Sequence, residues 1–192
     1  VSHNSIYNTP RAGINISEGT WGGHIIEYND IFNTVKETGD HGTINSWGRD
    51  RFWHPNYNIM TQITNEKPAL ILADVVEPII IRHNRLRCDR GWDIDLDDGS
   101  SNYQIYNNLC LNGGIKLREG FYRTVENNII VNNTLHPHLW FKNSGDVFSR
   151  NIVMTKYKPI SVRGWGREVD YNIFADSLAY LAARQLGGDA HS

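Results

Sequence analysis

The sequence predicts an all-β fold, a right-handed parallel β-helix built from coils of about 20–25 residues. A short phrase that contains asparagine and ends on an apolar residue returns seven times along the chain. A second stretch with period-two alternation follows most of these phrases. Strongly helical periodicity is almost absent before the last twenty residues. Units of this size cannot bury an apolar side alone, so they must stack on one another.

The repeated phrase sets the length of the unit. Its copies are HNSI at 3–6, YNDI at 28–31, HNRL at 83–86, YNNL at 106–109, ENNI at 126–129, SRNI at 149–152 and DYNI at 170–173. Their final apolar residues are separated by 25, 55, 23, 20, 23 and 21 residues, so five of the six spacings describe one coil. An asparagine that recurs at one turn is expected to form a ladder of side-chain amides along the axis.

The second strand of each coil follows the phrase. Its copies are Ile14-Asn15-Ile16, Ile44-Asn45-Ser46, Ile94-Asp95-Leu96, Ile115-Lys116-Leu117, Leu139-Trp140-Phe141 and Ile160-Ser161-Val162. Stacking makes these strands parallel and gives a pectate-lyase-like solenoid with a continuous core. A leucine-rich repeat has a similar unit length, but its fixed leucine spacing is missing and the inward positions are mostly isoleucine and valine.

The spacing of 55 residues leaves an extra segment at about 47–78. Either one coil has diverged here or a long loop leaves the stack, and long ordered loops are commonly functional. The segment carries Trp47, Arg49, Arg51, Trp53, His54 and Tyr57; its purely structural alternative is a lid over the core. Residues 1–192 are otherwise predicted to form a single β-helix domain. Both ends lack a cap, so we expect an excerpt of a longer solenoid, completed by a missing segment or by another chain.

Composition argues against several functions. The formal net charge of −2 and a pI near 6.5 give no basic excess for nucleic acid. No apolar run is long enough to span a bilayer and no signal pattern is present, so no membrane partner is expected; the compartment stays open between cytoplasm and secretion. GxSxG, zinc-type and phosphate-loop motifs are also missing.

Cys88 and Cys110 are predicted to be free thiols, because they fall on opposite faces of the pleat.

Residues 93–98 predict the functional face. With Ile94 and Leu96 inward, the alternation sends Asp93, Asp95 and Asp97 outward. The same registration on neighbouring coils gives three columns: Asn15, Asn45, Asp95, Lys116, Trp140 and Ser161; Ser17, Trp47, Asp97, Arg118, Lys142 and Arg163; and Glu18, Gly48, Asp98, Glu119, Asn143 and Gly164.

The third column predicts a catalytic carboxyl pair. Adjacent strands lie about 4.8 Å apart, so Asp98 and Glu119 should approach the roughly 5–5.5 Å separation of retaining glycosidases. Asp97 is the diagonal alternative to Asp98. Two carboxyl groups this close cannot both ionise cheaply, so one should keep its proton and act as the acid while the other attacks.

Other residues of this face are predicted to contact the substrate. They are His41, Trp47, Asp95, Lys116, Arg118, His138, Trp140 and Lys142, with His136 as a further candidate. The acidic cluster has two alternative interpretations. It is either a solvated surface neutralised by Lys116, Arg118 and Arg163, or a calcium site at Asp93, Asp95 and Asp97. A calcium site with Lys116, Arg118 or Lys142 as base would make the protein a polysaccharide lyase or epimerase on uronate chains.

Two phrases carry a family resemblance. GDHGTINSWGRDRFW at 39–53 and WDIDLDDGSSNYQIYNNLCLNGGIKLREGFYRTVENNI at 92–129 resemble the β-helix glycoside hydrolases that include β-xylosidases, commonly numbered family 120. In that family an aspartate on one coil is the nucleophile and a glutamate on the next is the acid/base of a retaining mechanism. The resemblance implies Glu119 in LREG as acid/base and Asp97 or Asp98 in DLDDG as nucleophile, with Asp95 also open. Family members are much longer and resemble a β-helix bearing an inserted β-sandwich.

We therefore expect a retaining, exo-acting glycosidase on plant-derived oligosaccharide, with β-xylosidase as the specific hypothesis and no cofactor. The alternatives are the calcium-dependent lyase or epimerase, and a non-catalytic carbohydrate-binding or fibre module that uses the same face.

Overall fold

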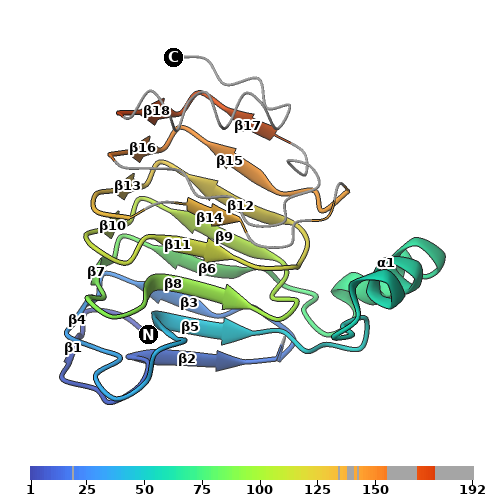
Figure 1. The fold of residues 1–192 in the computed structure, drawn as a ribbon, viewed down its shortest axis with the longest axis horizontal. Coiled ribbons are helices and arrows are strands. Elements are labelled where there is room, and N and C mark those ends of the chain that lie inside the picture. The colour runs from blue at the N-terminus through green and yellow to red at the C-terminus, as the bar shows by residue number, and fades with distance from the viewer. Residues whose placement is uncertain (19, 134, 138–140, 142, 155–167, 176–192) are drawn as a thin grey trace.

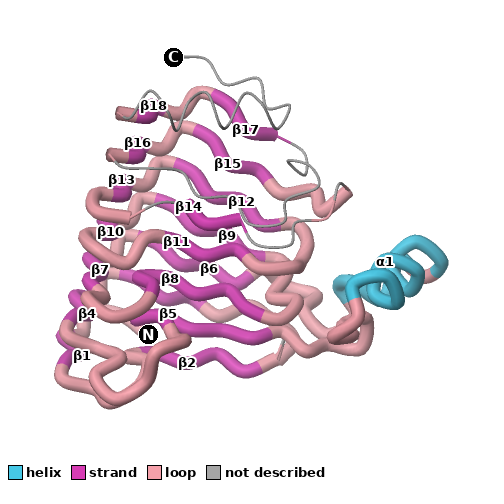
Figure 2. Tube along the Cα trace, in the orientation of Figure 1, coloured by secondary structure: helices cyan, strands magenta, loops and turns pink. Residues whose placement is uncertain are grey.

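A computed structural model describes residues 1–192 except 19, 134, 138–140, 142, 155–167 and 176–192. Its strands form three sheets in which every pairing is parallel (Figures 1 and 2). Sheet I contains β2 (Ile14–Ser17), β5 (Gly42–Trp47), β8 (Trp92–Asp97), β11 (Ile115–Leu117) and β14 (Leu135–Pro137). Sheet II contains β3 (Ile25–Glu27), β6 (Ile79–Arg82), β9 (Tyr103–Tyr106), β12 (Arg123–Glu126), β15 (Val147–Ser149) and β17 (Glu168–Asp170). Sheet III contains β1 (Ser5–Tyr7), β4 (Asp30–Phe32), β7 (Arg85–Arg87), β10 (Leu109–Cys110), β13 (Ile129–Ile130), β16 (Ile152–Val153) and β18 (Ile173–Phe174).

The chain visits the three sheets in a fixed order. From β2 to β16 it passes repeatedly from sheet I to sheet II to sheet III, and each new strand pairs with the strand of the preceding repeat. The prediction of an all-β fold with parallel stacked strands is confirmed. Because every repeat adds one strand to each sheet, equivalent residues of successive repeats lie side by side, and this register positions the site.

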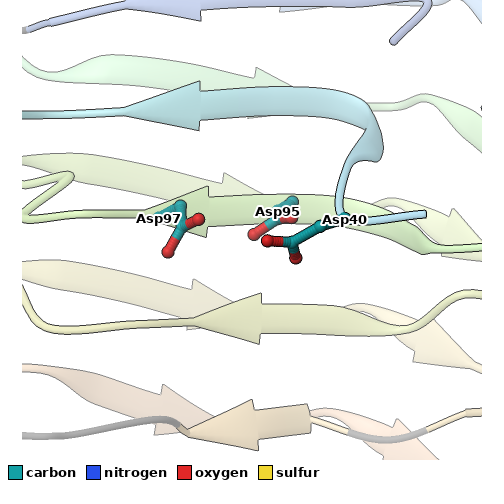
Figure 3. A group of neighbouring side chains, drawn as sticks. All are labelled: Asp40, Asp95 and Asp97. Carbon is teal, nitrogen blue, oxygen red and sulfur yellow. The ribbon is translucent and has the colours of Figure 1, made fainter. Parts of the chain in front are cut away.

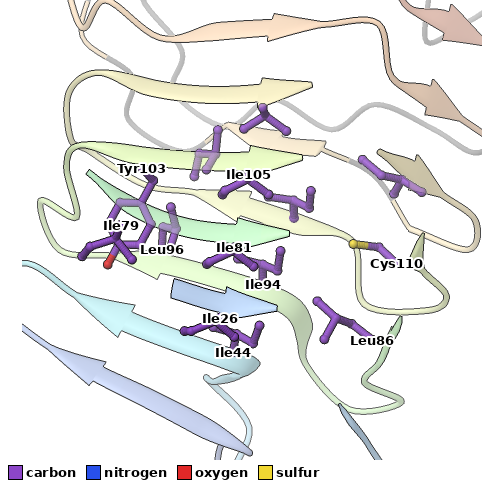
Figure 4. Packing of buried hydrophobic residues seen from close by; sticks show 14 of the residues in the cluster. Ile26, Ile44, Ile79, Ile81, Leu86, Ile94, Leu96, Tyr103, Ile105 and Cys110 are labelled. Carbon is purple, nitrogen blue, oxygen red and sulfur yellow. The ribbon is translucent and has the colours of Figure 1, made fainter. Parts of the chain in front are cut away.

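One apolar cluster draws residues from all three sheets (Figure 4). Ile44 and Ile94 come from sheet I, Ile81 from sheet II, and Leu86 and Cys110 from sheet III; each is at most 1 % exposed. A second cysteine, Cys88, is also buried, and both thiols are free, as predicted. The predicted reason was wrong, since Cys110 lies on the inward face.

Because Cys110 points inward, the predicted register of sheet III is wrong by one residue in its later strands. Leu109, Ile129, Ile152 and Ile173 were predicted to match Ile31 and Leu86. The structure instead pairs Leu86 with Cys110, Cys110 with Ile130, and Ile130 with Val153, leaving Ile129 43 % and Ile173 60 % exposed. The slip arises because the copies were aligned on their final apolar residue. The asparagine equivalent to Asn84 stands directly before that residue in the last four copies and two residues before it in the first three.

The predicted amide ladder is confirmed at the asparagine equivalent to Asn84. Its members are Asn4, Asn29, Asn84, Asn108, Asn128, Asn151 and Asn172. The backbone N–H of Asn84 donates to Asn108 Oδ1 at 3.0 Å, and that of Asn128 donates to Asn151 Oδ1 at 2.9 Å. The side-chain amides donate along the same stack. We call this set the asparagine stack.

The segment between β5 and β6 leaves the sheets and contains α1 (Tyr57–Glu66) and the 3-10 helix η1 (Pro68–Leu72). The sequence predicted a diverged coil or a long loop here and did not predict α1, whose β-branched residues lower helix propensity. The available signal was Asn56, whose side chain caps the helix by accepting from the N–H groups of Asn58 and Ile59. A second apolar cluster of Phe52, Met60, Ile71, Phe121 and Phe141 anchors the segment. No helix among the described residues is long and apolar enough to cross a bilayer.

Candidate functional site

The first predicted column of sheet I is confirmed as far as β11, and the second as far as β8. Asn15 pairs with Asn45, Asn45 with Asp95, and Asp95 with Lys116. Ser17 pairs with Trp47, which in turn pairs with Asp97.

The columns were wrong beyond β11. His136, not Trp140, lies opposite Lys116. The strand that pairs with β11 is β14, upstream of the alternation at 139–141, and it ends on Pro137, a residue that weakens a strand signal. The predicted site residues His138, Trp140 and Lys142 and the neighbouring Arg163 lie outside the described residues.

Asp93 has a structural environment that differs from the prediction. Its side chain is fully buried and accepts hydrogen bonds from the backbone N–H groups of Cys88 at 2.6 Å, Asn112 at 3.1 Å and Gly114 at 3.1 Å. These bonds use both carboxylate oxygens to hold two turns together. Asp93 therefore does not point outward as a surface residue or join the predicted calcium ligands.

Asp40, Asp95 and Asp97 gather at one point of sheet I (Figure 3). One carboxylate oxygen from each lies within 4.8 Å of the others. Such oxygens suit a hard cation such as calcium. However, the Lys116 ammonium already lies among them, with Nζ 3.6 Å from Asp40, 3.0 Å from Asp95 and 3.6 Å from Asp97. A protein cation thus occupies the place that the alternative hypothesis gave to calcium.

The charges of this group depend on burial. Burial raises the pKa of Asp95 to about 7, although the Lys116 ammonium opposes the shift. Burial alone would lower the pKa of Lys116, but the carboxylates of Asp95 and Asp97 outweigh it and raise that pKa. Lys116 therefore stays protonated at neutral pH.

Arg118 joins the three carboxyl groups that were predicted to be catalytic. Its Nη1 lies 2.9 Å from Asp97 Oδ1 and 3.1 Å from Asp98 Oδ1, and its Nε lies 2.9 Å from Glu119 Oε2. Asp98 has a left-handed φ of 36°, followed by Gly99 at 84°, so the chain turns sharply at the end of β8. This turn brings Asp98 to the same guanidinium as Asp97. The sequence predicted a pair, Asp98 with Glu119 and Asp97 as the alternative to Asp98, and the structure places all three side chains around one guanidinium.

Two residues of the 48–78 segment complete the group. Arg49 Nε donates to Asp98 Oδ2 at 2.8 Å, and Trp53 Nε1 donates to Glu119 Oε1 at 3.1 Å. The Arg49 guanidinium also lies 5.3 Å from the centre of the Trp53 ring, a cation–π distance. Neither Arg49 nor Trp53 was among the predicted site residues. Their position just after β5, at the edge where β8 and β11 also end, was the signal.

A buried ion pair braces the turn that carries Glu119. Arg123 Nη2 lies 2.6 Å from Asp146 Oδ2, both side chains are fully buried, and Arg123 Nη1 donates to the carbonyl of Arg118. The carbonyl of Arg118 is therefore held from the protein interior.

The environments of Asp97 and Glu119 shift their pKa values in opposite directions. Burial raises the pKa of Glu119, and the Asp98 charge adds to that rise against the opposing effects of Arg118 and Trp53. Burial would also raise the pKa of Asp97, but Lys116 and Arg118 outweigh it and lower that pKa. Such a separation divides two carboxyl groups into a proton donor and an anion.

Two other residues predicted to contact the substrate, Trp47 and His41, lie at the two ends of β5. Trp47 Nε1 donates to Glu18 Oε1 at 3.3 Å, and Arg11 lies over the Trp47 ring at 5.8 Å. His41 Nδ1 lies 3.0 Å from Thr38 Oγ1. Burial and the neighbouring Arg11 lower the pKa of His41, which keeps the imidazole neutral at physiological pH.

Comparison with known proteins assigns no family. No protein-family model matches the chain, and no curated protein or solved structure matches it. The site geometry therefore carries the functional argument.

Proposed function

We propose that this protein is a retaining glycoside hydrolase in which Asp97 is the nucleophile and Glu119 is the acid/base. One observation carries the proposal: carboxyl groups from consecutive repeats share the Arg118 guanidinium and have pKa values shifted in opposite directions. Retaining glycoside cleavage needs one carboxylate and one protonated carboxyl group at the same bond.

The proposed scaffold is a right-handed parallel β-helix of the pectate-lyase-like class. Its support is the fixed order of the three parallel sheets, the shared apolar cluster and the asparagine stack. Right-handedness follows from the strong preference of parallel crossover connections.

In the proposed reaction Glu119 protonates the leaving glycosidic oxygen while Asp97 attacks the anomeric carbon. Water then hydrolyses the glycosyl ester, with Glu119 accepting its proton. Asp97 is favoured over Asp98 as nucleophile on two grounds. Asp97 has the more exposed side chain, 18 % against 8 %, and Asp98 is held by Arg49 as well as Arg118.

The proposed substrate is a plant-derived oligosaccharide cleaved from one end, with a β-xyloside as the specific candidate. This choice depends on the resemblance of residues 39–53 and 92–129 to the β-xylosidase family. Trp47 and His41 are proposed to contact the sugar, and the same role for His138, Trp140 and Lys142 remains a prediction. The calcium-dependent lyase or epimerase is disfavoured by the Lys116 ammonium among the acidic side chains. A non-catalytic carbohydrate-binding module is the remaining alternative.

Product analysis on an aryl β-xyloside and on polygalacturonate, each with and without chelator, tests the proposal. We expect release of the aryl group, unaffected by chelator, and a loss of about 10²–10⁴-fold in Glu119→Gln, the range for general acid catalysis. Glu66→Gln, the same substitution on the exposed side of α1, should retain full activity.

The nucleophile is tested separately by Asp97→Ala and Asp98→Ala. Azide should restore glycosyl transfer in Asp97→Ala, because the small anion fits the space of the missing carboxylate, and should not do so in Asp98→Ala. Rescue of Asp98→Ala alone would reverse that assignment.

In the product analysis, unsaturated uronides that vanish with chelator would favour the lyase, and sugar binding without cleavage would favour the binding module.

A further inference from the structure

We propose that the cavity beside Trp21 is a second sugar-binding subsite that holds a neutral ring of the oligosaccharide next to the carboxylate group. The proposal deepens the proposed function and depends on it for the identity of the reacting site. A cavity of about 340 Å³ is lined by Glu18, Thr20, Trp21, Arg49, Asp50, Arg51 and Asp74. This volume lies at the lower end of the range for small-molecule sites, which suits one sugar ring.

Arg49 connects the cavity to the proposed catalytic group. Arg49 lines the cavity and also binds Asp98, while its guanidinium covers Trp53, whose indole binds Glu119. Glu18 and Asp98 directly follow Ser17 and Asp97, which lie two strands apart in one column of sheet I. That spacing is roughly 10 Å. A chain of sugar rings that reaches the carboxyl groups along this face would therefore pass the cavity.

Trp21 offers an aromatic surface at the edge of this cavity. Its side chain is 67 % exposed, although burial of so large an apolar group is normally favourable. Its backbone is nevertheless fixed, because its N–H donates to the Asp74 carbonyl at 2.9 Å and its carbonyl accepts from the Glu77 N–H at 3.1 Å. An exposed indole on a fixed backbone can stack against the C–H face of a sugar ring.

The conformation of Trp21 is also strained. Its φ is 67°, in the left-handed region that disfavours residues other than glycine. The following Gly22 and Gly23 have φ values of 77° and 73°, so a glycine would suit position 21 as well. The backbone conformation therefore does not itself require a tryptophan at this position.

The polar lining indicates which sugars fit. Arg51 binds both oxygens of Asp74, with Nε at 2.8 and 3.0 Å, and Arg49 is paired with Asp98. The cavity lining therefore holds three acidic side chains and two guanidinium groups, and both guanidinium groups are already paired with acids. The acidic residues are Glu18, Asp50 and Asp74. Neutral hydroxyl groups can bond to both kinds of side chain, whereas a uronate carboxylate would meet net negative charge.

Trp21→Ala tests the subsite with xylotetraose and an aryl monoxyloside as substrates. We expect the KM for xylotetraose to rise about tenfold, and kcat/KM for the aryl monoxyloside to stay within about twofold. Tyr171→Ala is the matched control, because Tyr171 is 62 % exposed with a φ of 55° and lies away from the cavity. Tyr171→Ala should leave KM and kcat/KM unchanged for both substrates.

Trp21→Gly separates binding from folding. It should lose xylotetraose affinity as Trp21→Ala does, while its thermal midpoint should be no lower than that of Trp21→Ala, because glycine relieves the left-handed strain. Equal losses on both substrates, or none on xylotetraose, would overturn the subsite. Trigalacturonate bound as tightly as xylotetraose would overturn its preference for neutral sugars.

Calorimetric titration of catalytically impaired Glu119→Gln distinguishes the two proposals. If the unsubstituted protein does not cleave the aryl xyloside, the proposed function fails. Xylotetraose binding that Trp21→Ala weakens about tenfold in the Glu119→Gln background would still support the subsite. If cleavage occurs but this binding is insensitive to Trp21, only the subsite fails.

Discussion

The asparagine stack and the charged face of sheet I are both columns of equivalent residues, but they treat their polar atoms differently. In the stack, Asn128 Oδ1 accepts from both N–H and Nδ2 of Asn108, and Asn128 Nδ2 donates to the carbonyls of Ile105 and Glu126. On sheet I, Asp95 Oδ1, Arg118 Nε and Glu119 Oε2 are buried and make ion-pair contacts without aligned hydrogen bonds.

This difference separates a stabilising column from a column suited to chemistry. A neutral amide stack satisfies each member with its neighbours, so identical residues can repeat without limit. Buried groups that lack aligned partners carry a cost of about 1–3 kcal/mol each, and such costs are commonly retained where a ligand supplies the missing bond. We therefore expect substitutions in the stack to change folding and those around Arg118 to change binding or catalysis.

Asn128→Ala should give the largest effect on stability. The substitution removes the acceptor of Asn108 and the donor to the carbonyls of Ile105 and Glu126, so we expect a loss of about 3–5 kcal/mol in the free energy of unfolding. Denaturant titration measures it. The control is Asn132→Ala, whose side chain makes an exposed bond to Asn112 and should cost little. A loss below about 1 kcal/mol in Asn128→Ala, or reduced activity per folded molecule, would contradict the division of roles.

The repeat itself was predictable, because parallel stacking forces residues of one kind to recur at one spacing. The exact inward residue was not, since YNNL and ENNI offer two asparagines and two candidate apolar positions. Only the hydrogen bonds of the stack show that Asn108 and Asn128 are the equivalents of Asn84, and that Cys110 and Ile130 point inward. A one-residue slip in a strand exchanges its two faces.

Asp95→Asn should give the next largest effect, as a change in how stability depends on pH. The pKa of Asp95 rises from its ordinary value of 3.8 to about 7 in the folded protein. A raised carboxyl pKa supports folding most below the ordinary pKa, and this support is lost as pH rises through the folded value. We expect wild-type unfolding free energy to lose on the order of 3 kcal/mol from this group between about pH 5 and pH 8.

Denaturant titrations across that range compare wild type with Asp95→Asn, which should lack this part of the decline. Asp89→Asn is the control, because Asp89 is exposed and pairs with Arg87 at the surface. An unchanged pH dependence in Asp95→Asn would show that Lys116 keeps Asp95 ionised throughout.

The site was predictable only where the strand register fixes it. Alternation placed Asp95, Asp97 and Lys116 correctly. It could not place Asp93, whose carboxylate binds the backbone of two turns, because the amide groups of a turn leave no pattern in the sequence. Arg49 reaches the site from a segment that follows no repeat, so its contact with Asp98 depends on tertiary packing alone.

The smallest expected effect comes from the exposed ion pair on sheet III, which tests whether burial distinguishes the two regions. Arg85 and Asp30 lie on paired strands, with Nη1 2.6 Å from Oδ1, and their side chains are 50 % and 41 % exposed. A double-mutant cycle with alanine should give a coupling below about 1 kcal/mol, lower still in about 0.5 M salt. Activity should not change. A larger coupling that resists salt would mean that stacking in a parallel sheet strengthens ion pairs by itself, and the ion pairs of Arg118 on sheet I would then need no functional explanation.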